Sequence, residues 1–499
     1  MARKILLLLL SVCGIWAGEE RKAERIKIVI DYANIRGGGD EAAVLKEIVF
    51  PSAIGRIAPW LKVVNPNPAK LMAMPIQFTC GVPLLTSSSS QTEQPGHLIV
   101  FPYFVEDQRG SYLASSMPCF AEEEDGRPRI GVMGINKPNI MLGEQPVEML
   151  IHHITHELIH LLMFDTEIYT RSPLGTNFVA VNVTSGDQTV TKFVGPNIIE
   201  WGKAHFKCES FDGILAEDEE QAGQNGNHFE KVLAGNELMT ATFTERPVIS
   251  KLTMAVFQDS GWYDVDFSQA EPNKWGKDAG CDFLRINCDA SRFDEFCSGV
   301  DEVFCANDFR TKTRCVRNQF TNGCFVKVPS IGHDCAIRSV ASRTFDAEYF
   351  GAYSRCFPVH NMNLVVAGCF MSFCSDDLKR LYIVTPKSTY LCKEGDTIRF
   401  SYYTVKCPAP QDFCTFADMN RCPDDCSGNG YCNYRNQCIC TFAYEGENCK
   451  TLKRWDRLIG SALYKTIVQS RKDDFDMSTL SKAAPVAAVF AAFAFALAW

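Results

Sequence analysis

Residues 156–160, which read His-Glu-Leu-Ile-His, constrain the fold of this chain more than any other feature. Apolar residues surround the pentapeptide at the spacing of one helical face, and Pro146 stands where the first turn of a helix tolerates proline. The pattern predicts a helix from about residue 147. On a helix, residues four apart share a face, so the imidazoles of His156 and His160 should lie about 6 Å apart.

Two imidazoles at this spacing suit two ligands of one zinc ion, and Glu157 is close enough to hydrogen-bond a metal-bound water. Together they supply what metal-assisted hydrolysis of a peptide needs: a Lewis acid, an activated water and a general base. The alternative interpretation is a buried helix whose histidines are hydrogen-bonded core residues. With 9 histidines in 499 residues, the motif should arise by chance in only about one such chain in a hundred, which favours the metal site.

A third ligand must come from outside the predicted helix. His152 and His153 precede the motif, but three ligands strung over about 12 Å of helix cannot all reach one ion at about 2.1 Å, so we expect both to be core or supporting groups. His228 follows a loop rich in glycine and asparagine that can present a side chain closely to a metal. Glu237 competes with it, because residues 236–240 look like the N-E-x-x-S/T segment that supplies a glutamate ligand in thermolysin-like enzymes. Spacing alone does not decide between them.

Length, charge and the N-terminal residues bound the class of protein. At 499 residues the chain should divide into two to four domains. A formal net charge of -9 indicates no basic surface for nucleic acid, so we expect none as a partner. Residues 1–18 combine a basic start, an apolar run and small residues, which is typical of a secretory signal peptide.

Cysteines are distributed unevenly along the chain. Nineteen of the 23 crowd into residues 281–449, and loss of Cys13 with the signal peptide leaves an even number, as a disulfide framework requires. We therefore expect a secreted protein whose first half is held mainly by its apolar core and whose second half is held by disulfides. In a secreted chain, Asn182 in the sequon Asn-Val-Thr is a candidate for glycosylation.

The C-terminal end of the chain is apolar. Residues 483–499 carry no charge and would make a helix of about 25 Å, short of the roughly 30 Å of a bilayer core. Small residues precede this tail, namely Ser478, Thr479 and Ser481. The pattern favours a signal that is exchanged for a GPI anchor, after a linker over residues 451–482. A tail-anchored helix and a protein secreted without an anchor are the alternatives.

Residues 417–450 hold six closely spaced cysteines and resemble an epidermal-growth-factor-like module, with the terminal spacing C-x-C-x5-G-x2-C. The resemblance implies the disulfide pairs Cys422–Cys432, Cys426–Cys438 and Cys440–Cys449. No convincing calcium-binding pattern precedes the first cysteine. We interpret the module as a spacer or adhesion unit without calcium.

Longer stretches of the chain resemble the leishmanolysin family of surface zinc endopeptidases. They are residues 228–231, 236–240, 252–263, 275–276 and 279–284, with further likeness at 25–28, 131–136 and 204–208. In that family a long insertion separates the third histidine from the helix, and here 67 residues lie between His160 and His228. Met239 stands eleven residues after His228, like the methionine in the turn beneath the family's zinc. The resemblance implies one zinc ion held by His156, His160 and His228, with Glu157 as the general base.

One position departs from the family pattern. The family continues H-E-x-x-H-x-x-G, in which the glycine lets the helix end, whereas this chain has Met163 at that position. Methionine does not readily take a positive φ. We therefore expect the helix to end in another way, or to run on for a turn before the chain leaves towards the third ligand.

The resemblance implies an α+β, metzincin-like fold in which a twisted sheet from residues 24–145 backs the motif helix. The predicted divisions are the signal peptide (1–18), an N-terminal catalytic subdomain (19–165), a central subdomain with His228 and Met239 (166–275), a disulfide-rich β-containing domain (276–416), the epidermal-growth-factor-like module (417–450), the linker (451–482) and the apolar tail (483–499).

The expected function is that of a zinc metalloendopeptidase at the cell surface. Its expected partners are protein or peptide substrates, and a membrane reached through the C-terminal anchor or tail. The alternative is a catalytically idle, leishmanolysin-like adhesion protein on the same scaffold. Metal content and cleavage of a generic unfolded protein would separate the two.

Overall fold

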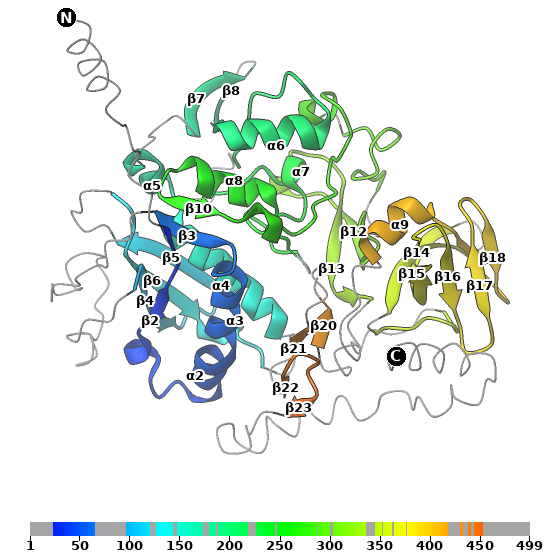
Figure 1. Ribbon diagram of the computed structural model, residues 1–499, viewed down its shortest axis with the longest axis horizontal. Helices are drawn as coiled ribbons and strands as arrows, with labels where there is room; N and C mark the ends of the chain where they lie inside the picture. Colours follow the sequence, from blue (N-terminus) through cyan, green and yellow to red (C-terminus); the bar gives the residue numbers. More distant parts are fainter. Residues whose placement is uncertain are drawn as a thin grey trace, which may run out of the picture.

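The computed structural model describes residues 23–64, 96–119, 126–142, 147–172, 179–185, 188–217, 226–244, 247–286, 288–299, 303–335, 345–351, 353–361, 364–375, 377–417, 430–432, 438–440 and 444–452 (Figure 1). The predicted signal peptide, most of the linker and the apolar tail lie outside these residues. Among the helices in the described ranges, none has the length and apolar character needed to cross a membrane. The described residues form both helices and strands, as predicted.

The N-terminal region is built on a four-stranded sheet. Its order is β2 (Ile28–Ile30), β4 (Leu98–Val105), β6 (Ile130–Asn136) and β5 (Ala114–Cys119). The first three strands run parallel, and β5 runs antiparallel to β6. Strands β4 and β6 are largely apolar and buried, as parallel strands covered on both faces require. In the described part of the chain β5 pairs only with β6, which leaves its other edge open.

Helices pack against this sheet. α2 (Gly39–Val44), a π-helical segment η2 (Leu45–Val49) and α3 (Phe50–Ile57) follow one another without a break, and α4 (Val147–Leu162) lies next to β5. Gly131 of β6 permits the close approach of α4, because a Cβ atom there would lie 2.6 Å from the side chain of Leu161. One continuous core of buried side chains joins these helices to the sheet. Helix α4, which carries the motif, is therefore packed firmly against the N-terminal sheet.

A sheet and an ion pair help to attach the N-terminal region to residues beyond 260. β3 (Leu61–Val64) is the central strand of a second sheet, between β1 (Ala23–Arg25) and β10 (Tyr263–Val265). In addition, Arg56 of α3 forms an ion pair with Glu271 at 3.1 Å. These contacts fix the chain that follows the motif helix against the first subdomain.

The described residues between the motif helix and residue 260 form four helices and a small sheet. They contain α5 (Thr166–Arg171), a small sheet of β7 (Val179–Ser185), β8 (Gln188–Phe193) and β9 (Ile214–Leu215), then α6 (Pro196–Phe206), α7 (Lys231–Ala234) and α8 (Lys251–Asp259). Short 3-10 helices lie at η1 (Tyr32–Ile35), η5 (Lys137–Asn139), η8 (Phe267–Gln269), η9 (Phe283–Arg285) and η10 (Gln319–Thr321). Asp259 accepts hydrogen bonds from Asn197 and Ile198, so the end of α8 caps the start of α6.

The described residues between 303 and 417 contain a three-stranded and a six-stranded antiparallel sheet and α9 (Pro410–Ala417). One sheet consists of β11 (Val303–Cys305), β12 (Thr311–Val316) and β13 (Val326–Asp334). The other has the order β17 (Thr389–Cys392), β16 (Leu381–Val384), β15 (Leu364–Cys374), β14 (Ser354–Asn361), β19 (Thr404–Lys406) and β18 (Thr397–Arg399), at the opposite end of the molecule from the N-terminal sheet (Figure 1).

Disulfides cross-link this second half, as predicted. The described pairs are Cys208–Cys281, Cys288–Cys324, Cys297–Cys315, Cys305–Cys356, Cys335–Cys369, Cys374–Cys414 and Cys392–Cys407. Cys208–Cys281 joins the central region to the disulfide-rich one. Its 73-residue separation encloses His228, Met239 and α8, and closing a loop of that length should stabilise the fold by about 4 kcal/mol.

The predicted epidermal-growth-factor-like module is described only in part. It contains two short hairpins, β20 (Gly430–Cys432) with β21 (Cys438–Cys440) and β22 (Tyr444–Glu445) with β23 (Thr451–Leu452). Cys438 and Cys449 are disulfide-bonded. The three predicted pairs remain predictions, because at least one side chain of each pair lies outside the described residues.

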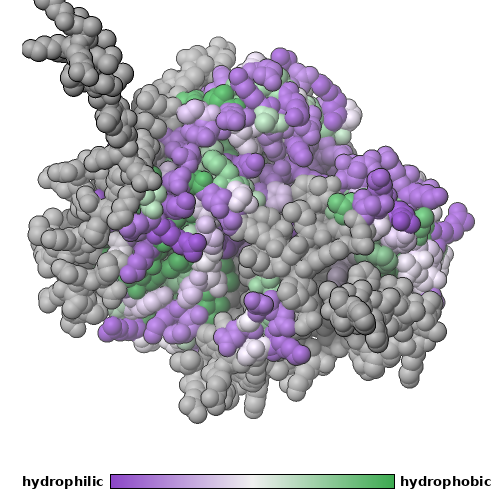
Figure 2. Space-filling model, viewed as in Figure 1, coloured by the Kyte–Doolittle hydropathy of each residue, from purple (hydrophilic) through white to green (hydrophobic). Residues whose placement is uncertain are grey.

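Surface polarity differs between parts of the molecule. On the face shown in Figure 2, hydrophilic residues predominate over the described surface. Hydrophobic residues show mainly in the lower left part, where Figure 1 places α3, α4 and the N-terminal sheet.

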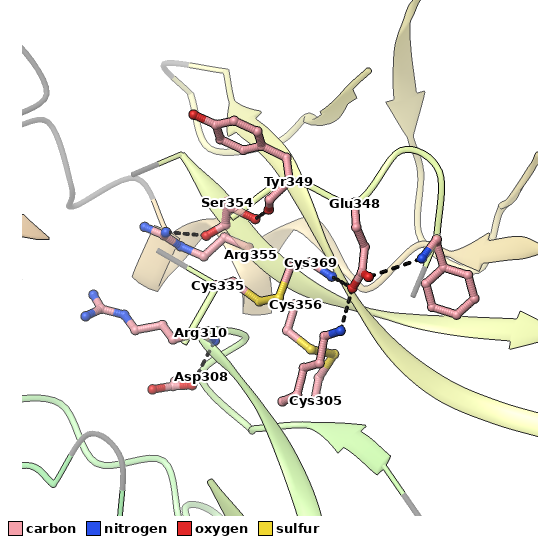
Figure 3. The surroundings of a disulfide bond; sticks show 12 residues. Cys305, Asp308, Arg310, Cys335, Glu348, Tyr349, Ser354, Arg355, Cys356 and Cys369 are labelled. Carbon is pink, nitrogen blue, oxygen red and sulfur yellow. Dashed lines mark hydrogen bonds and ion pairs between the residues drawn. A yellow bond between two sulfur atoms is a disulfide. The ribbon is translucent and has the colours of Figure 1, made fainter. Parts of the chain in front are cut away.

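A buried ion pair lies among the disulfides of the second half. Lys312 of β12 binds the carboxylate of Glu348, and their side chains are only 5% and 0% exposed. Glu348 also accepts hydrogen bonds from the backbone N–H groups of Cys369 and Phe345 (Figure 3). A charge removed from water in this way must keep its partner, because an unpaired buried charge is strongly destabilising.

Replacement of Lys312 by Met should therefore destabilise the protein by about 3 kcal/mol or more, measured by urea unfolding with the disulfides intact. The matched control is Lys62→Met, because Lys62 pairs with Asp264 while both side chains are about half exposed (48% and 47%). The control should cost less than about 1 kcal/mol. Equal effects of the two substitutions would contradict a special contribution from the buried pair.

Candidate metal centre

Helix α4 presents two of the predicted ligands on one face. The Nε2 atoms of His156 and His160 lie 2.9 Å apart, and their rings meet edge to face. The four-residue spacing accounts for this proximity, as the sequence predicted. The helix supplies one wall of the site and leaves the opposite side to another segment.

His228 reaches the same point from a loop. Its Nε2 atom lies 3.1 Å from that of His156 and 3.0 Å from that of His160. Backbone contacts fix the loop: the His228 carbonyl accepts a hydrogen bond from the N–H of Glu217, and the N–H of Phe229 donates to the carbonyl of Met239. Gly226 precedes the histidine with a φ of +80°, a conformation that favours glycine. In the described ranges these three histidines form the group able to hold a metal ion.

Hydrogen bonds set the orientation of both helix imidazoles. His156 donates from Nδ1 to the carbonyl of Leu238 at 2.7 Å, and His160 donates from Nδ1 to the carbonyl of Phe164 at 2.6 Å. With the proton on Nδ1, each Nε2 offers its lone pair to the centre of the triangle. Burial, together with the charge of His160, lowers the pKa of His156 well below its ordinary value, which favours the neutral form that binds metals.

This donor set fits zinc. Three neutral imidazole nitrogens this close together can share one ion at the usual zinc–nitrogen distance of about 2.0–2.1 Å, and three nitrogen ligands leave a fourth position of a tetrahedral zinc open. A histidine that binds zinc through one ring nitrogen usually donates a hydrogen bond from the other, often to a backbone carbonyl, and this bond orients the ring. The residues present thus suit the predicted metal.

The helix ends without a left-handed residue. The N–H of Met163 still binds the carbonyl of Ile159, the N–H of Phe164 turns to the same carbonyl, and Asp165 binds back to Met163. Met163 is fully buried and does not take a positive φ. The methionine at the family's glycine position is accommodated as expected, and the turn places the Phe164 carbonyl under His160.

Glu157 is buried beside the histidines. Its Oε2 atom accepts a hydrogen bond from the hydroxyl of Ser116 at 2.7 Å, and the same hydroxyl lies 3.0 Å from the Glu157 carbonyl. Burial raises the pKa of this carboxyl, while the charge of His160 and the hydroxyl of Ser116 oppose the rise. A buried carboxyl whose pKa is raised is a better proton acceptor than an ordinary exposed one.

The remaining histidines of the motif region belong to the core around the site. His153 binds the Met149 carbonyl through Nδ1 and stacks on Phe243, with ring centroids 4.1 Å apart. His152 is buried near the same phenylalanine. Neither joins the metal-binding group, as the helix geometry predicted.

Glu237 lies apart from the histidine cluster. Its Oε1 atom accepts hydrogen bonds from the backbone N–H of Ser250 and from the hydroxyl of Thr253, in the first turn of α8. The structure therefore brings His228, and not Glu237, to the two helix histidines. Met239 is fully buried. It directly follows Leu238, whose carbonyl accepts the hydrogen bond of His156.

Other predicted sites lie away from the cluster. Asn182 falls within β7, an edge strand of its small sheet. His205, which is not among the predicted ligands, hydrogen-bonds the carbonyl of Trp275. Ser116 and the carbonyls of Leu238 and Phe164 were not predicted, because no sequence pattern marks a residue on a distant strand or a backbone atom as a partner of the motif.

Comparison with known proteins finds a similar peptidase family. The sequence profile described as leishmanolysin, a peptidase family, matches residues 95–331, which include the three histidines, Glu157 and Met239. Over these residues the chain is similar to the leishmanolysin family. The matched range leaves out the helices α2 and α3 and the six-stranded sheet.

Leishmanolysin relatives occur in distant organisms. The chain is 31% identical over 196 residues to a leishmanolysin homolog of Crithidia fasciculata, an alignment that covers 39% of this chain and 28% of the relative. It is 30% identical over 215 residues to a leishmanolysin-like peptidase of Drosophila melanogaster, covering 36% and 32%. It is 28% identical over 348 residues to a ciliated left-right organizer metallopeptidase of Danio rerio, covering 64% and 55%. The chain thus spans about a third to a half of the length of these relatives.

The geometry predicts different effects of two substitutions on metal content. His228→Ala removes one of three converging nitrogens and should lose bound zinc on dialysis, whereas Glu237→Ala should keep most of it, because Glu237 contacts α8 instead. Zinc per chain, measured by atomic emission, decides the matter. If Glu237→Ala emptied the site and His228→Ala did not, a thermolysin-like ligand set would replace the one described.

Proposed function

We propose that this chain is a zinc-dependent metalloendopeptidase with a metzincin-like arrangement of its site. The observation that carries the proposal is the convergence of the Nε2 atoms of His156, His160 and His228, with Glu157 buried next to them. The similarity of residues 95–331 to a peptidase family supports the same reaction class. A core function for these histidines alone would not require three lone pairs to face one point.

Each residue would have a distinct role in peptide cleavage. The three histidines would hold zinc, which supplies a Lewis acid that polarises the scissile carbonyl and lowers the pKa of the attacking water. Glu157 would take the proton of that water and pass it to the leaving amine. Its side chain is buried, and the hydroxyl of Ser116 holds its carboxylate in place by a hydrogen bond.

The open edge of β5 supports an extended peptide as substrate. Ser116 lies on this strand, next to the exposed side chains of Ser115 and Met117. An unpaired strand edge can add an extended chain through backbone hydrogen bonds. A substrate bound there would pass beside Glu157, which matches the cleavage of protein or peptide substrates.

We further propose that the protein acts at the cell surface. The dense disulfides are typical of proteins that mature in an oxidising, secretory compartment. The predicted signal peptide and GPI anchor would place it on the membrane, with a tail-anchored or secreted form as the alternative. Glycosylation at Asn182 belongs to the same proposal.

The role of Glu157 can be tested by an isosteric change. Glu157→Gln keeps the shape of the side chain but cannot accept the proton, so zinc should stay bound while kcat on an unfolded protein substrate falls by about 10²–10⁴-fold. Glu167→Gln is the control, because Glu167 is exposed on α5. Full activity of Glu157→Gln would remove this residue from the mechanism.

A wild-type chain that binds zinc but cleaves nothing, with or without chelator, would favour the idle adhesion protein.

Ser116 should affect turnover through Glu157. Ser116→Ala removes the hydrogen bond to the carboxylate and should lower kcat about tenfold with little change in KM, whereas Ser116→Thr keeps a hydroxyl and should retain most of the activity. The matched control is Ser115→Ala, one residue along the same strand with an exposed side chain. Equal activities of the two alanine variants would contradict a role for Ser116.

A further inference from the structure

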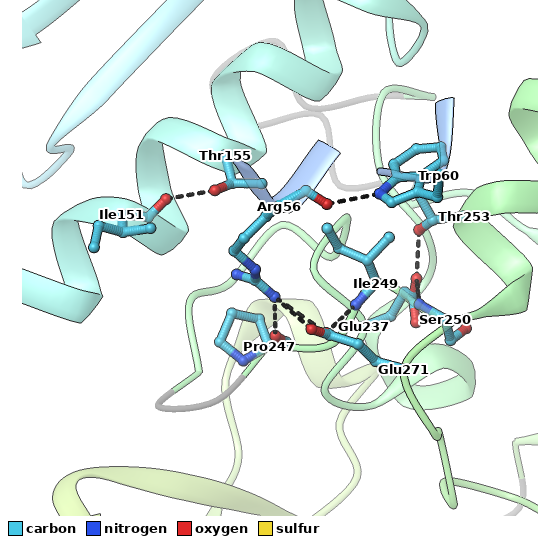
Figure 4. Close-up of polar contacts among 10 residues, drawn as sticks. All are labelled: Arg56, Trp60, Ile151, Thr155, Glu237, Pro247, Ile249, Ser250, Thr253 and Glu271. Atoms are coloured by element: carbon cyan, nitrogen blue, oxygen red, sulfur yellow. Dashed lines mark hydrogen bonds and ion pairs between the residues drawn. The ribbon is translucent and has the colours of Figure 1, made fainter. Parts of the chain in front are cut away.

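Glu237 is a buried carboxyl group that the proposed reaction does not use. Only 1% of the residue is exposed, and burial is the main reason that its pKa is raised to about 7. Its bonds to Ser250 and Thr253 place it at the N-terminus of the nine-residue helix α8 (Figure 4). Ser250 itself caps this helix through a hydrogen bond from Leu252. A buried polar group with two well-defined donors is a strong positional constraint.

The residues next to Glu237 contact both parts of the metal centre. We call residues 236–240 the support loop. Within it, the carbonyl of Leu238 accepts the hydrogen bond of His156, and the carbonyl of Met239 accepts the N–H of Phe229, the neighbour of His228. The support loop therefore contacts His156, a ligand on helix α4, and Phe229, the neighbour of the third ligand His228.

The other side of the support loop is bound to a fixed strip of backbone. The N–H of Leu238 donates to the carbonyl of Val248, and the N–H of Val248 donates to the carbonyl of Asn236. Beyond Val248, Glu271 accepts the N–H of Ile249 and is paired with Arg56 of α3 (Figure 4). Residues 247–250 are thus anchored to the N-terminal region, and Glu237 ties the support loop to the same strip.

We propose that Glu237 is a positioning residue of the metal centre, which holds the Leu238 carbonyl against His156 by binding the start of α8. The inference rests on the proposed zinc site but not on peptide cleavage. Glu237 does not bind the metal itself. Its loss should therefore leave all three histidine nitrogens available as ligands but orient them less precisely. Outer contacts of metal-binding histidines commonly change metal affinity by about tenfold to a hundredfold.

The proposal makes a specific statement about side-chain chemistry. Both donors bind the same oxygen, Oε1, and glutamine keeps an oxygen acceptor at that position. Glu237→Gln should therefore preserve the positioning that Glu237→Ala destroys.

The experiment uses the full chain loaded with zinc, or with cobalt as a spectroscopic substitute. Transfer of zinc to a chromophoric chelator gives the dissociation rate, and the visible absorption of Co²⁺ reports ligand geometry. Glu237→Ala should release zinc about tenfold faster than wild type and alter the cobalt spectrum, while Glu237→Gln should match wild type on both measures. Thr253→Val removes one donor without changing the shape of the side chain, so its zinc release rate should lie between those of the two Glu237 variants. It replaces Glu237→Ala as the test if that variant does not fold.

Asp259→Ala is the matched control. Asp259 is a buried carboxyl at the other end of α8 that caps α6, so its loss should lower the melting temperature without changing zinc release. If Glu237→Ala released zinc no faster than Asp259→Ala, the positioning role would be overturned and Glu237 would be a stabilising cap only. If the wild-type chain bound neither metal, the proposed zinc site would fail, and this inference with it.

Discussion

The convergence of three imidazole nitrogens is the interaction on which the rest of the site depends. Each of the Nε2 atoms of His156, His160 and His228 lies about 3 Å from the other two. Neutral lone pairs that face one another do not attract, so the surrounding fold must hold them in place until a cation binds. Carbonyls from two different segments perform this task for the helix histidines, Leu238 from the support loop and Phe164 from the turn after α4.

Rigid structure stands behind each of these segments. α4 is buried against the N-terminal sheet, where Gly131 permits the helix to approach closely. The support loop is bound to residues 247–250, and these are joined to α3 through Glu271 and Arg56. The disulfide Cys208–Cys281 closes the whole stretch that supplies His228. The segment that carries His228 is therefore held by backbone hydrogen bonds, an ion pair and a disulfide.

The two halves of the chain are stabilised by different physical means. The N-terminal and central regions share one large apolar core, which includes α4, α8 and the N-terminal sheet. The second half has smaller clusters of buried side chains and depends on disulfides and on the buried pair of Lys312 and Glu348. This division follows the distribution of cysteines and places the metal centre in the half with the larger core.

Local patterns in the sequence determined much of this picture. Helical spacing around residues 156–160 predicted α4 and the shared face of His156 and His160, because these depend only on residues within two turns. Cysteine density predicted a disulfide-rich second half, and the resemblance to leishmanolysin pointed to His228. Sequence spacing could not choose between His228 and Glu237, since the choice depends on where the chain folds back. The same holds for Ser116, for the carbonyl partners of the histidines and for the pairing of the cysteines. Only the tertiary structure decided these, because each is a contact between residues far apart in the chain whose distance no local pattern encodes.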